Sequence, residues 1–184
     1  MRVIAGISRG MKLKSPKGLN TRPTTDRVKE AIFSMINPYI IDSVVLDLFS
    51  GTGSIGIEAL SRGAEKAYFV DNNKNSIHVI KENIAYTKFS EKSTVLFCDA
   101  QKAIKELCLG ANKIDIIFMD PPYLKNLILP TINKIEAQGI LNDDGIIVVE
   151  HDIKDSLPKE IGKFIKIKEK KYGNTLITIY SEEA

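Results

Sequence analysis

From residue 44 onward, short apolar runs alternate with segments whose apolar residues recur at helical spacing. The runs are rich in β-branched residues, which is typical of buried strands. They predict strands at 44–49, 66–70, 94–98, 114–119 and 146–150. The intervening segments predict helices at 54–62, 73–86, 101–109 and 127–137, and a short one at 153–159. This order predicts an α/β fold, in which a mostly parallel sheet is covered on both faces through right-handed crossovers.

The two ends of the chain follow other patterns. Phe164–Lys168 and Leu176–Tyr180 predict two strands, and the short link between them favours a hairpin at an antiparallel edge of the sheet, seven strands in all. Residues 2–21 are rich in Gly, Lys and Arg and predict a small β-hairpin or arm. An amphipathic helix follows, with a cap at Thr24, Thr25 or Asp26 and an apolar face of Val28, Ala31, Ile32, Met35 and Ile36. We expect this basic arm and helix, residues 1–40, to pack on a main domain, residues 41–184.

Composition narrows the class of protein. The chain has 184 residues, 43% apolar and 27% charged, as expected of a soluble globular protein with a sizeable core. No apolar run approaches the roughly 18 residues of a membrane helix, and the N-terminus lacks the apolar core of a secretion signal. Cys98 and Cys108 lack metal-type spacing. We therefore expect a cytoplasmic monomer with no membrane partner and no metal.

Charge is distributed unevenly along the chain. Residues 1–30 carry eight Lys or Arg and two Asp or Glu, a net +6, whereas the remaining residues carry −3. Such an arm suggests a polyanionic partner met at one end of the molecule. A solvated, charged N-terminus is the alternative, and charge alone leaves the two open.

A glycine-rich loop joins the first predicted strand to its helix. Gly51, Gly53 and Gly56 satisfy G-x-G-x-x-G, and Asp71 stands twenty residues after Gly51, as in nicotinamide-dinucleotide sites. However, Asp47 lies immediately before the loop, where its carboxylate would oppose a pyrophosphate and favour a cationic amino-acid ligand. The chain also offers no convincing group for hydride transfer, because His78 and His151 read as surface or structural residues.

S-adenosylmethionine satisfies these residues together, since it has an amino-acid end, a ribose and an adenine. Gly51 and Gly53 would let the backbone approach the methionyl portion. Asp71, followed by Asn72, would accept the ribose hydroxyls. Asp99 would accept from the adenine amino group, with the Ala100 N–H facing a ring nitrogen. Each aspartate alone is more often a cap or turn former, but one follows each of the first three strands.

The stretch Asp120-Pro121-Pro122-Tyr123 follows the fourth predicted strand. Two prolines cannot donate backbone hydrogen bonds, so the strand must stop there. The result is a rigid corner with a carboxylate, prolyl carbonyls and an aromatic ring. These groups suit a flat heterocycle held by its ring face and its exocyclic amino group. An ordinary strand-ending turn is the alternative for the tetrapeptide alone.

Together these motifs resemble the amino-group branch of the Rossmann-like S-adenosylmethionine-dependent methyltransferases. Phe49 stands where a first glycine often stands in other methyltransferases, as in that branch. Residues 2–6, 10–13 and 22–30 further resemble the small-subunit rRNA guanine-N2 methyltransferase family, D type. The resemblance covers residues 2 to about 180, including 58–63 and 172–175.

The resemblance implies methyl transfer to the exocyclic N2 of a guanine in 16S rRNA, within the assembled small ribosomal subunit, with S-adenosylhomocysteine as the product. Asp120 and the Pro121 carbonyl would accept the two amino N–H bonds, and Tyr123 would stack on a base drawn out of its stack. Candidate phosphate contacts are Arg2, Arg9, Lys12, Arg22 and Arg27.

Three rival functions stay open at this point. The first is another amino methyltransferase, acting on adenine N6 in DNA or RNA or on a protein amide. The second is a dinucleotide-dependent oxidoreductase, and the third is a catalytically silent RNA-binding factor. The sequence does not identify the guanine that is methylated.

Overall fold

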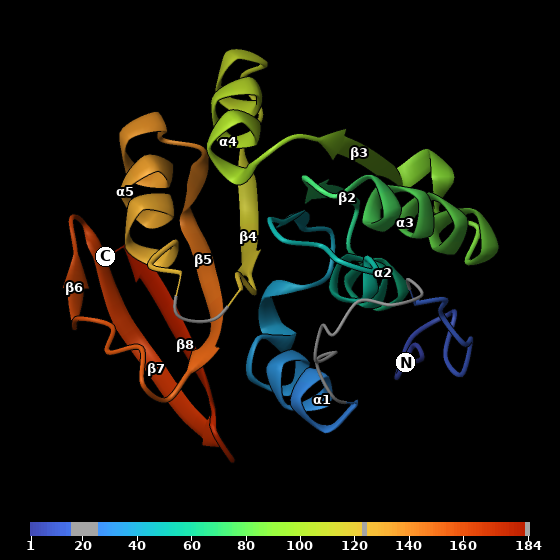
Figure 1. Ribbon diagram of the computed structural model, residues 1–184, viewed down its shortest axis with the longest axis horizontal. Coiled ribbons are helices and arrows are strands. Elements are labelled where there is room, and N and C mark those ends of the chain that lie inside the picture. The colour runs from blue at the N-terminus through green and yellow to red at the C-terminus, as the bar shows by residue number, and fades with distance from the viewer. Residues whose placement is uncertain (16–25, 123–124, 183–184) are drawn as a thin grey trace.

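The computed structural model of the chain describes residues 1–15, 26–122 and 125–182. In these residues eight strands form one sheet in the order β3-β2-β1-β4-β5-β8-β7-β6 (Figure 1). The strands are β1 (Val44–Asp47), β2 (Lys66–Asp71), β3 (Ser93–Phe97), β4 (Ile114–Met119), β5 (Leu141–Asp152), β6 (Glu160–Ile161), β7 (Phe164–Tyr172) and β8 (Thr175–Glu182). Strands β1 to β5 pair in parallel, and β8 joins β5 in antiparallel orientation. The predicted α/β class and the antiparallel hairpin are confirmed.

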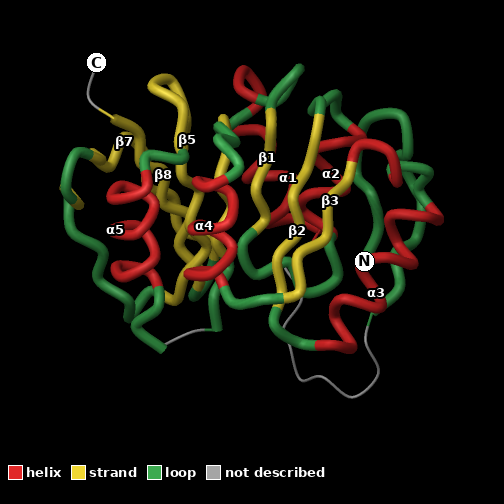
Figure 2. Tube along the Cα trace, turned by 90° about the horizontal axis from the view of Figure 1, so that it is seen from above, coloured by secondary structure: helices red, strands yellow, loops and turns green. Residues whose placement is uncertain are grey.

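Helices cover both faces of this sheet (Figure 2). The helices are α1 (Asp26–Met35), α2 (Ser54–Ser61), α3 (Lys74–Tyr86), α4 (Ala100–Leu109) and α5 (Ile128–Gln138), with short 3-10 turns at Asn37–Tyr39 and Ser90–Lys92. Two apolar clusters lie between the sheet and its helices, one on each face. One cluster joins the sheet to α1, α2 and α3, and the other joins it to α4 and α5.

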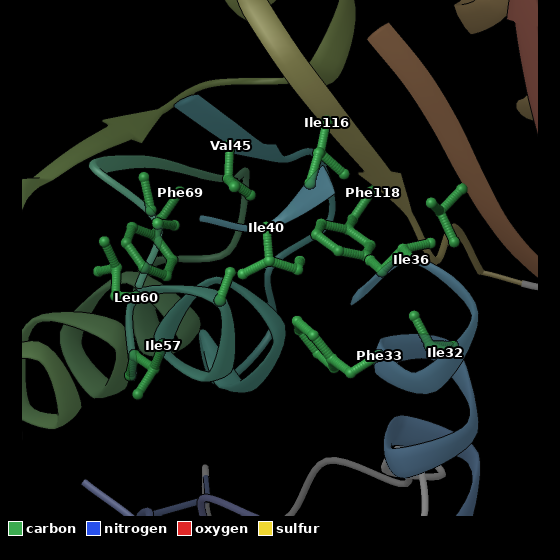
Figure 3. Close-up of a cluster of buried hydrophobic side chains, with 14 of the residues drawn as sticks. Ile32, Phe33, Ile36, Ile40, Val45, Ile57, Leu60, Phe69, Ile116 and Phe118 are labelled. Carbon is green, nitrogen blue, oxygen red and sulfur yellow. The ribbon is translucent and has the colours of Figure 1, made fainter. Parts of the chain in front are cut away.

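The first cluster is centred on aromatic and branched side chains (Figure 3). Phe33 of α1 packs 5.7 Å from Phe118 of β4, measured between ring centroids, and Phe69 of β2 is fully buried beneath α2. Burial of such side chains stabilises the fold by roughly 1.5–3 kcal/mol each. The buried face of α1 differs from the prediction, because Lys29 and Phe33 are buried while Ala31 and Met35 are half-buried.

The short helix predicted at 153–159 is wrong. The chain turns there instead, because the Asp152 carboxylate accepts from the Lys154 N–H at 2.9 Å and the Asp152 carbonyl accepts from the Asp155 N–H at 2.9 Å. Pro158 also lacks the N–H that a helix needs. The two-residue strand β6, which pairs with β7, follows this turn and accounts for the eighth strand.

The predicted N-terminal hairpin is present as a compact loop. Arg2 and Lys12 form an antiparallel bridge, and the Val3 N–H donates to the Met11 carbonyl at 3.0 Å. Val3 and Leu13 are buried in the same cluster as α1 and α2. The residues at 16–25, which include the proposed cap residues Thr24 and Thr25, lie outside the described chain. The division at residue 40 stays a prediction.

Candidate active site

The tips of four parallel strands meet at one edge of the sheet. Strand β1 lies between β2 and β4, so the strand order reverses beside it, and open α/β sheets bind ligands at such a switch point. Asp47 and Asp71 are the last residues of β1 and β2, while Asp99 and Asp120 follow β3 and β4 within two residues. The topology thus brings together the carboxylates that the sequence predicted for the site.

Ser50 anchors the glycine loop between β1 and α2 to the ends of strands β1 and β2. The Ser50 hydroxyl donates to the Asp47 carbonyl at 2.7 Å and accepts from the Val70 N–H at 2.9 Å. Gly51 has φ 55°, a left-handed conformation that favours glycine. No atom lies within 4 Å of a Cβ added to it, so the loop backbone is open on this side. A Cβ on Gly56 would meet the Phe69 ring at 2.4 Å, so this third glycine serves helix–strand packing.

Asp71 organises the loop tips around it. Its Oδ2 accepts from the Gly51 N–H at 2.9 Å and its Oδ1 accepts from the Asn73 N–H at 2.8 Å. Burial raises the pKa of Asp71, while these backbone donors oppose that rise. Asn73 in turn caps α3, since its side chain accepts from the Asn75 and Ser76 N–H groups. Asn72 is exposed at the same tip.

Asp47 lies beneath the loop, with only 4% of its surface exposed. Its Oδ2 accepts from the Gly56 N–H at 3.2 Å. Desolvation by burial raises the pKa of Asp47 to about 7, and the neighbouring charge of Asp71 adds to that effect. The carboxyl group therefore changes charge near neutral pH.

The tip of β3 presents a carboxylate and an aromatic ring. Asp99 is exposed and caps α4 by accepting from the Lys102 N–H at 2.9 Å, and Ala100 begins that helix. One carboxylate oxygen, Oδ1, is thus used for capping. Phe97 is 60% exposed, an unusual position for a large apolar ring. Phe49, at the tip of β1, is half-buried against α4 and its neighbours.

The corner after β4 is fixed to the neighbouring strand. The Leu48 N–H donates to the Phe118 carbonyl at 3.0 Å, which holds the tips of β1 and β4 together. Asp120 is half-buried, Pro121 is buried and Pro122 is exposed. Tyr123 lies outside the described residues, so its predicted stacking role has no structural description.

A hollow of about 400 Å³ adjoins this corner. We call it the corner hollow; it is lined by Pro121, Pro122, Leu127, Lys154, Asp155 and Leu157, among others. Its volume lies within the roughly 300–1,000 Å³ of small-molecule sites. His151 also borders it, but the ring is 1% exposed and its Nε2 lies 2.9 Å from the Thr178 hydroxyl, as expected of a structural histidine.

The candidate RNA-binding residues lie on or beside the arm. Arg2, Arg9, Lys12 and Arg27 are exposed, and the Arg2 Nε lies 3.0 Å from Asp26 Oδ2. Arg22 lies outside the described residues. None of the described His, Cys, Asp and Glu residues gather into a group that could hold a metal ion. Within the same part of the chain, no helix is long and apolar enough to cross a membrane.

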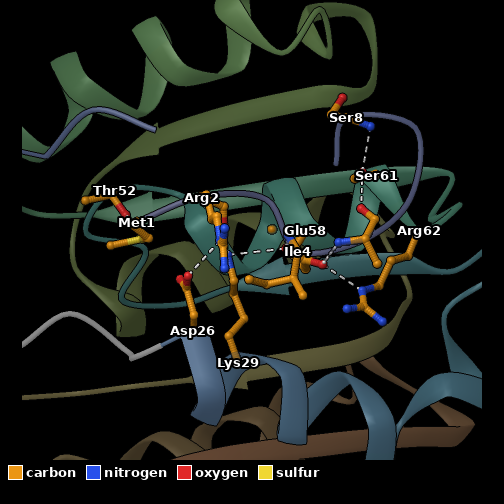
Figure 4. A network of polar contacts seen from close by, with 12 residues as sticks. Met1, Arg2, Ile4, Ser8, Asp26, Lys29, Thr52, Glu58, Ser61 and Arg62 are labelled. Atoms are coloured by element: carbon orange, nitrogen blue, oxygen red, sulfur yellow. Dashed lines mark hydrogen bonds and ion pairs between the residues drawn. The ribbon is translucent and has the colours of Figure 1, made fainter. Parts of the chain in front are cut away.

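A buried ionic cluster near the arm was missed from the sequence (Figure 4). Glu58 and Lys29 have fully buried side chains, and Glu58 Oε2 lies 3.3 Å from Lys29 Nζ. The Glu58 carboxylate also accepts from the N–H groups of Ile4 at 2.7 Å and Ala5 at 2.9 Å, and from Arg62 Nε at 2.8 Å. The signal in the sequence was a carboxylate inside the apolar helix α2 and a lysine on the apolar face of α1.

A second polar contact missed from the sequence ties the arm to the glycine loop. The Asn83 amide of α3 donates to the Thr52 carbonyl at 2.9 Å and to the Lys14 carbonyl at 3.1 Å, and its oxygen accepts from the Lys14 N–H at 2.8 Å. The arm is therefore joined directly to the loop that borders the candidate site.

The chain is similar in sequence and in fold to proteins named as methyltransferases. Residues 1–181 match the family described as conserved hypothetical protein 95. Over 99% of both chains, the sequence is 40% identical to YlbH of Bacillus subtilis, a protein provisionally named an rRNA methyltransferase. It is 34% identical to ribosomal RNA small subunit methyltransferase D of Escherichia coli, over 100% of this chain and 91% of that one. A solved Escherichia coli structure, provisionally named methyltransferase yhhF, is 35% identical and superposes with a TM-score of 0.86 over 100% and 98% of the two chains.

Proposed function

This chain belongs to the conserved hypothetical protein 95 family, that of ribosomal RNA small subunit methyltransferase D, and we propose that it methylates the exocyclic N2 of a guanine in 16S rRNA. The methyl donor is S-adenosylmethionine and the demethylated product is S-adenosylhomocysteine. The substrate is the rRNA of the small ribosomal subunit, in its assembled form. The reaction takes place in the cytoplasm.

One observation carries this proposal: the tips of β1, β2, β3 and β4 bring Asp47, Asp71, Asp99 and Asp120 to one edge of the sheet. A dinucleotide site needs a glycine loop open to a pyrophosphate. Here two carboxylates flank that loop, and Asp71 already accepts from the Gly51 N–H. The local potential therefore favours a ligand with a cationic amino-acid end.

The residues of the loop and tips fit S-adenosylmethionine. Gly51 and Gly53 would leave room for the methionyl portion, and Asp47 beneath them would supply negative charge toward its ammonium group. Asp71 and Asn72 would meet the ribose, and the Asp99 oxygen that does not cap α4 and the Ala100 N–H would meet the adenine. When bound, the donor supplies an electrophilic methyl group on a sulfonium.

Asp120 would carry the acceptor side of the reaction. The lone pair of a guanine amino group is delocalised into the ring and is a poor nucleophile. By accepting from the two N–H bonds, the Asp120 carboxylate and the Pro121 carbonyl would draw that nitrogen toward tetrahedral geometry and aim it at the methyl. As the N–C bond forms and the S–C bond breaks, one proton leaves the nitrogen toward Asp120 or water. Positioning and charge arranged in advance supply most of the rate.

The corner hollow supports guanine over adenine as the acceptor. In guanine the N1–H donor lies next to the amino group and the O6 acceptor lies beyond it, whereas adenine has an acceptor at N1. The half-buried Asp155 would accept from N1–H and the exposed Lys154 would donate to O6, while Pro122 and Leu157 would face the ring. An adenine in this hollow would leave the carboxylate facing a ring nitrogen that cannot donate.

The test is methylation of purified small subunits from cells lacking this gene. The protein and labelled S-adenosylmethionine are added, and the rRNA is then digested to nucleosides for mass spectrometry, with duplex DNA as the parallel substrate. We expect N2-methylguanosine from the subunits and no product from DNA. N6-methyladenosine from either substrate would instead establish the rival amino methyltransferase. Absence of any methylated nucleoside from subunits would contradict the proposal.

A further inference from the structure

A hollow separate from the corner hollow lies against the arm. It has a volume of about 700 Å³ and is bounded by the arm, by α1 with the 3-10 turn after it, and by the end of α2. We call it the arm hollow; the residues used below are Gly6, Arg9, Glu30, Ser34, Asn37 and Arg62. From these we infer that the arm hollow binds a phosphodiester of the rRNA substrate, away from the catalytic corner. The inference rests on the proposed function only in taking rRNA as the partner.

The Arg62 guanidinium is already held in place by contacts within the protein. Its Nε donates to Glu58 at 2.8 Å and its guanidinium carbon lies 4.7 Å from the centroid of the Phe33 ring. The side chain is only 16% exposed. Figure 4 shows the two terminal nitrogens directed away from Glu58. A guanidinium with one edge held and the other edge open matches a phosphate bidentately, and little rotamer entropy is lost on binding.

The charges around Arg62 leave the hollow positive. Glu58 is shared between Lys29 and Arg62. Burial lowers the pKa of Lys29, and the Glu58 charge opposes that fall. With Lys29 protonated, this cluster keeps one positive charge. Arg9, on the arm, adds a second positive charge and has no side-chain partner among the described residues. Glu30 opposes them with one negative charge. Ser34 and Asn37 add neutral hydrogen-bonding groups suited to phosphate oxygens.

The wall that carries Arg9 is held rigidly to the rest of the site. The Ile7 N–H donates to the Ser61 carbonyl at 2.9 Å, and the Ser61 hydroxyl donates to the Ala5 carbonyl at 2.6 Å. Gly6 approaches α2 so closely that an added Cβ would lie 1.7 Å from the Ser61 carbonyl oxygen. Both arginines therefore line a hollow whose arm wall is anchored to the end of α2.

The position of the hollow fits an extended RNA footprint. Helix α2 begins at the glycine loop and ends at the arm hollow, so a contact at Arg62 lies about one helix length from the candidate catalytic edge. Folded rRNA can span this separation, so one substrate molecule can make both contacts. The contact carries no sequence information and would position the rRNA.

The test measures binding of small subunits, and separately their methylation, at several salt concentrations. We expect Arg9→Ala to weaken binding roughly three- to tenfold at low salt and to lower the slope of log affinity against log salt by about 0.7–0.9, the value of one phosphate contact. The same variant raises the KM for subunits and leaves kcat and S-adenosylhomocysteine affinity unchanged. Glu30→Gln tightens binding, because it removes the opposing charge, and a purely structural role would not produce this gain.

Matched controls are Lys105→Ala on α4 and Glu160→Gln on β6, which change the same charges on exposed elements far from the hollow. Arg62→Lys keeps the charge but loses the bidentate edge, and its folding is checked by thermal unfolding. If Arg9→Ala and Glu30→Gln match their controls in affinity and salt slope, the inference is wrong. Subunits that bind but receive no methyl group would contradict the proposed function while leaving this inference standing.

Discussion

Asp120 is the residue on which the proposed chemistry depends most directly. It is half-buried at the corner after β4, where its carboxylate would take an N–H of the acceptor amine. We predict that Asp120→Ala lowers kcat at least a hundredfold, the usual cost of one preorganised polar group in an active site. Affinity for S-adenosylhomocysteine, measured by calorimetry, should change little. Asp144→Ala, at an exposed position of β5, is the control. Retained turnover in Asp120→Ala would remove the residue from the mechanism.

The burial of Asp47 predicts that the stability of the protein depends on pH. Its pKa rises from 3.8 to about 7 on folding, so between these values the folded chain holds a proton that the unfolded chain has lost. Stability therefore falls as pH rises from about 4 to about 7 and stays level above that. Three pKa units correspond to a cost of order 4 kcal/mol at pH 8. Asp47→Asn should remove most of this decline, as measured by denaturant unfolding at pH 4.5 and pH 8.

The same titration should appear in cofactor binding. If Asp47 attracts the ammonium group of the ligand, affinity for S-adenosylhomocysteine rises as pH increases through about 7, because the carboxyl group then becomes charged. Asp47→Asn should flatten this rise while being more stable than the parent protein at pH 8. A variant that is stabilised but keeps the pH dependence of binding would separate Asp47 from the ligand.

At the scale of elements, the buried cluster joins the arm to α1 and α2. Glu58 accepts from the arm backbone and from Lys29 and Arg62, all largely out of solvent. We predict that Glu58→Gln destabilises the protein by about 3–5 kcal/mol, because it leaves a buried ammonium without its counter-charge. The double variant Lys29→Met, Glu58→Met should lose less than Glu58→Gln does. Lys14→Ala, which breaks an exposed ion pair with Glu82, should cost less than about 1 kcal/mol.

Gly56 tests the packing of α2 on the sheet. A Cβ there would lie 2.4 Å from the Phe69 ring, so Gly56→Ala should destabilise by about 1–3 kcal/mol through overpacking. Adding Phe69→Leu should recover part of the loss, because the smaller side chain makes room. Denaturant unfolding of the single and double variants measures both effects. An additive loss in the double variant would show that the ring is not the obstacle.

The sequence predicts helices, strands and turns correctly where a local pattern determines them. Strand tips, the glycine loop and the C-terminal hairpin follow from apolar runs and turn residues, so they were found. The apolar spacing of 153–159 predicts a helix, but the chain turns there because the Asp152 carboxylate accepts from the Lys154 N–H. The cluster of Lys29, Glu58 and Arg62 joins residues far apart in sequence. Periodicity on a single helix carries no information about such partners.

At the scale of the whole molecule, the cation-rich arm contacts the glycine loop beside the acidic strand tips. Asn83 connects the Lys14 backbone of the arm to the Thr52 carbonyl of the glycine loop, and Met1 lies 3.3 Å from the Thr52 hydroxyl, measured from its sulfur. Order in the arm therefore supports the loop that borders the candidate site. A polyanion drawn to the arm would be held beside the loop, with its reactive base over the corner.

This arrangement predicts which small ligand stabilises the whole fold. A ligand present at 100 times its Kd adds about 2.7 kcal/mol to the free energy of unfolding, which for a chain of this size raises Tm by about 5–11 °C. We expect this shift with S-adenosylhomocysteine in a thermal unfolding assay, and none with NAD(H). Asp71→Asn should reduce it, because one of the two carboxylate oxygens at the tip of β2 becomes an amide.

The comparison between the two ligands separates the methyltransferase from the oxidoreductase without relying on turnover. Both ligands contain adenine and ribose, so binding to the tips of β2 and β3 alone would stabilise the protein with either one. Discrimination must come from the glycine loop, where Asp47 and Asp71 repel a pyrophosphate and attract an ammonium group. An equal rise in Tm with NAD(H) would mean that this repulsion is too weak to select the ligand, and the electrostatic argument for S-adenosylmethionine would then be wrong.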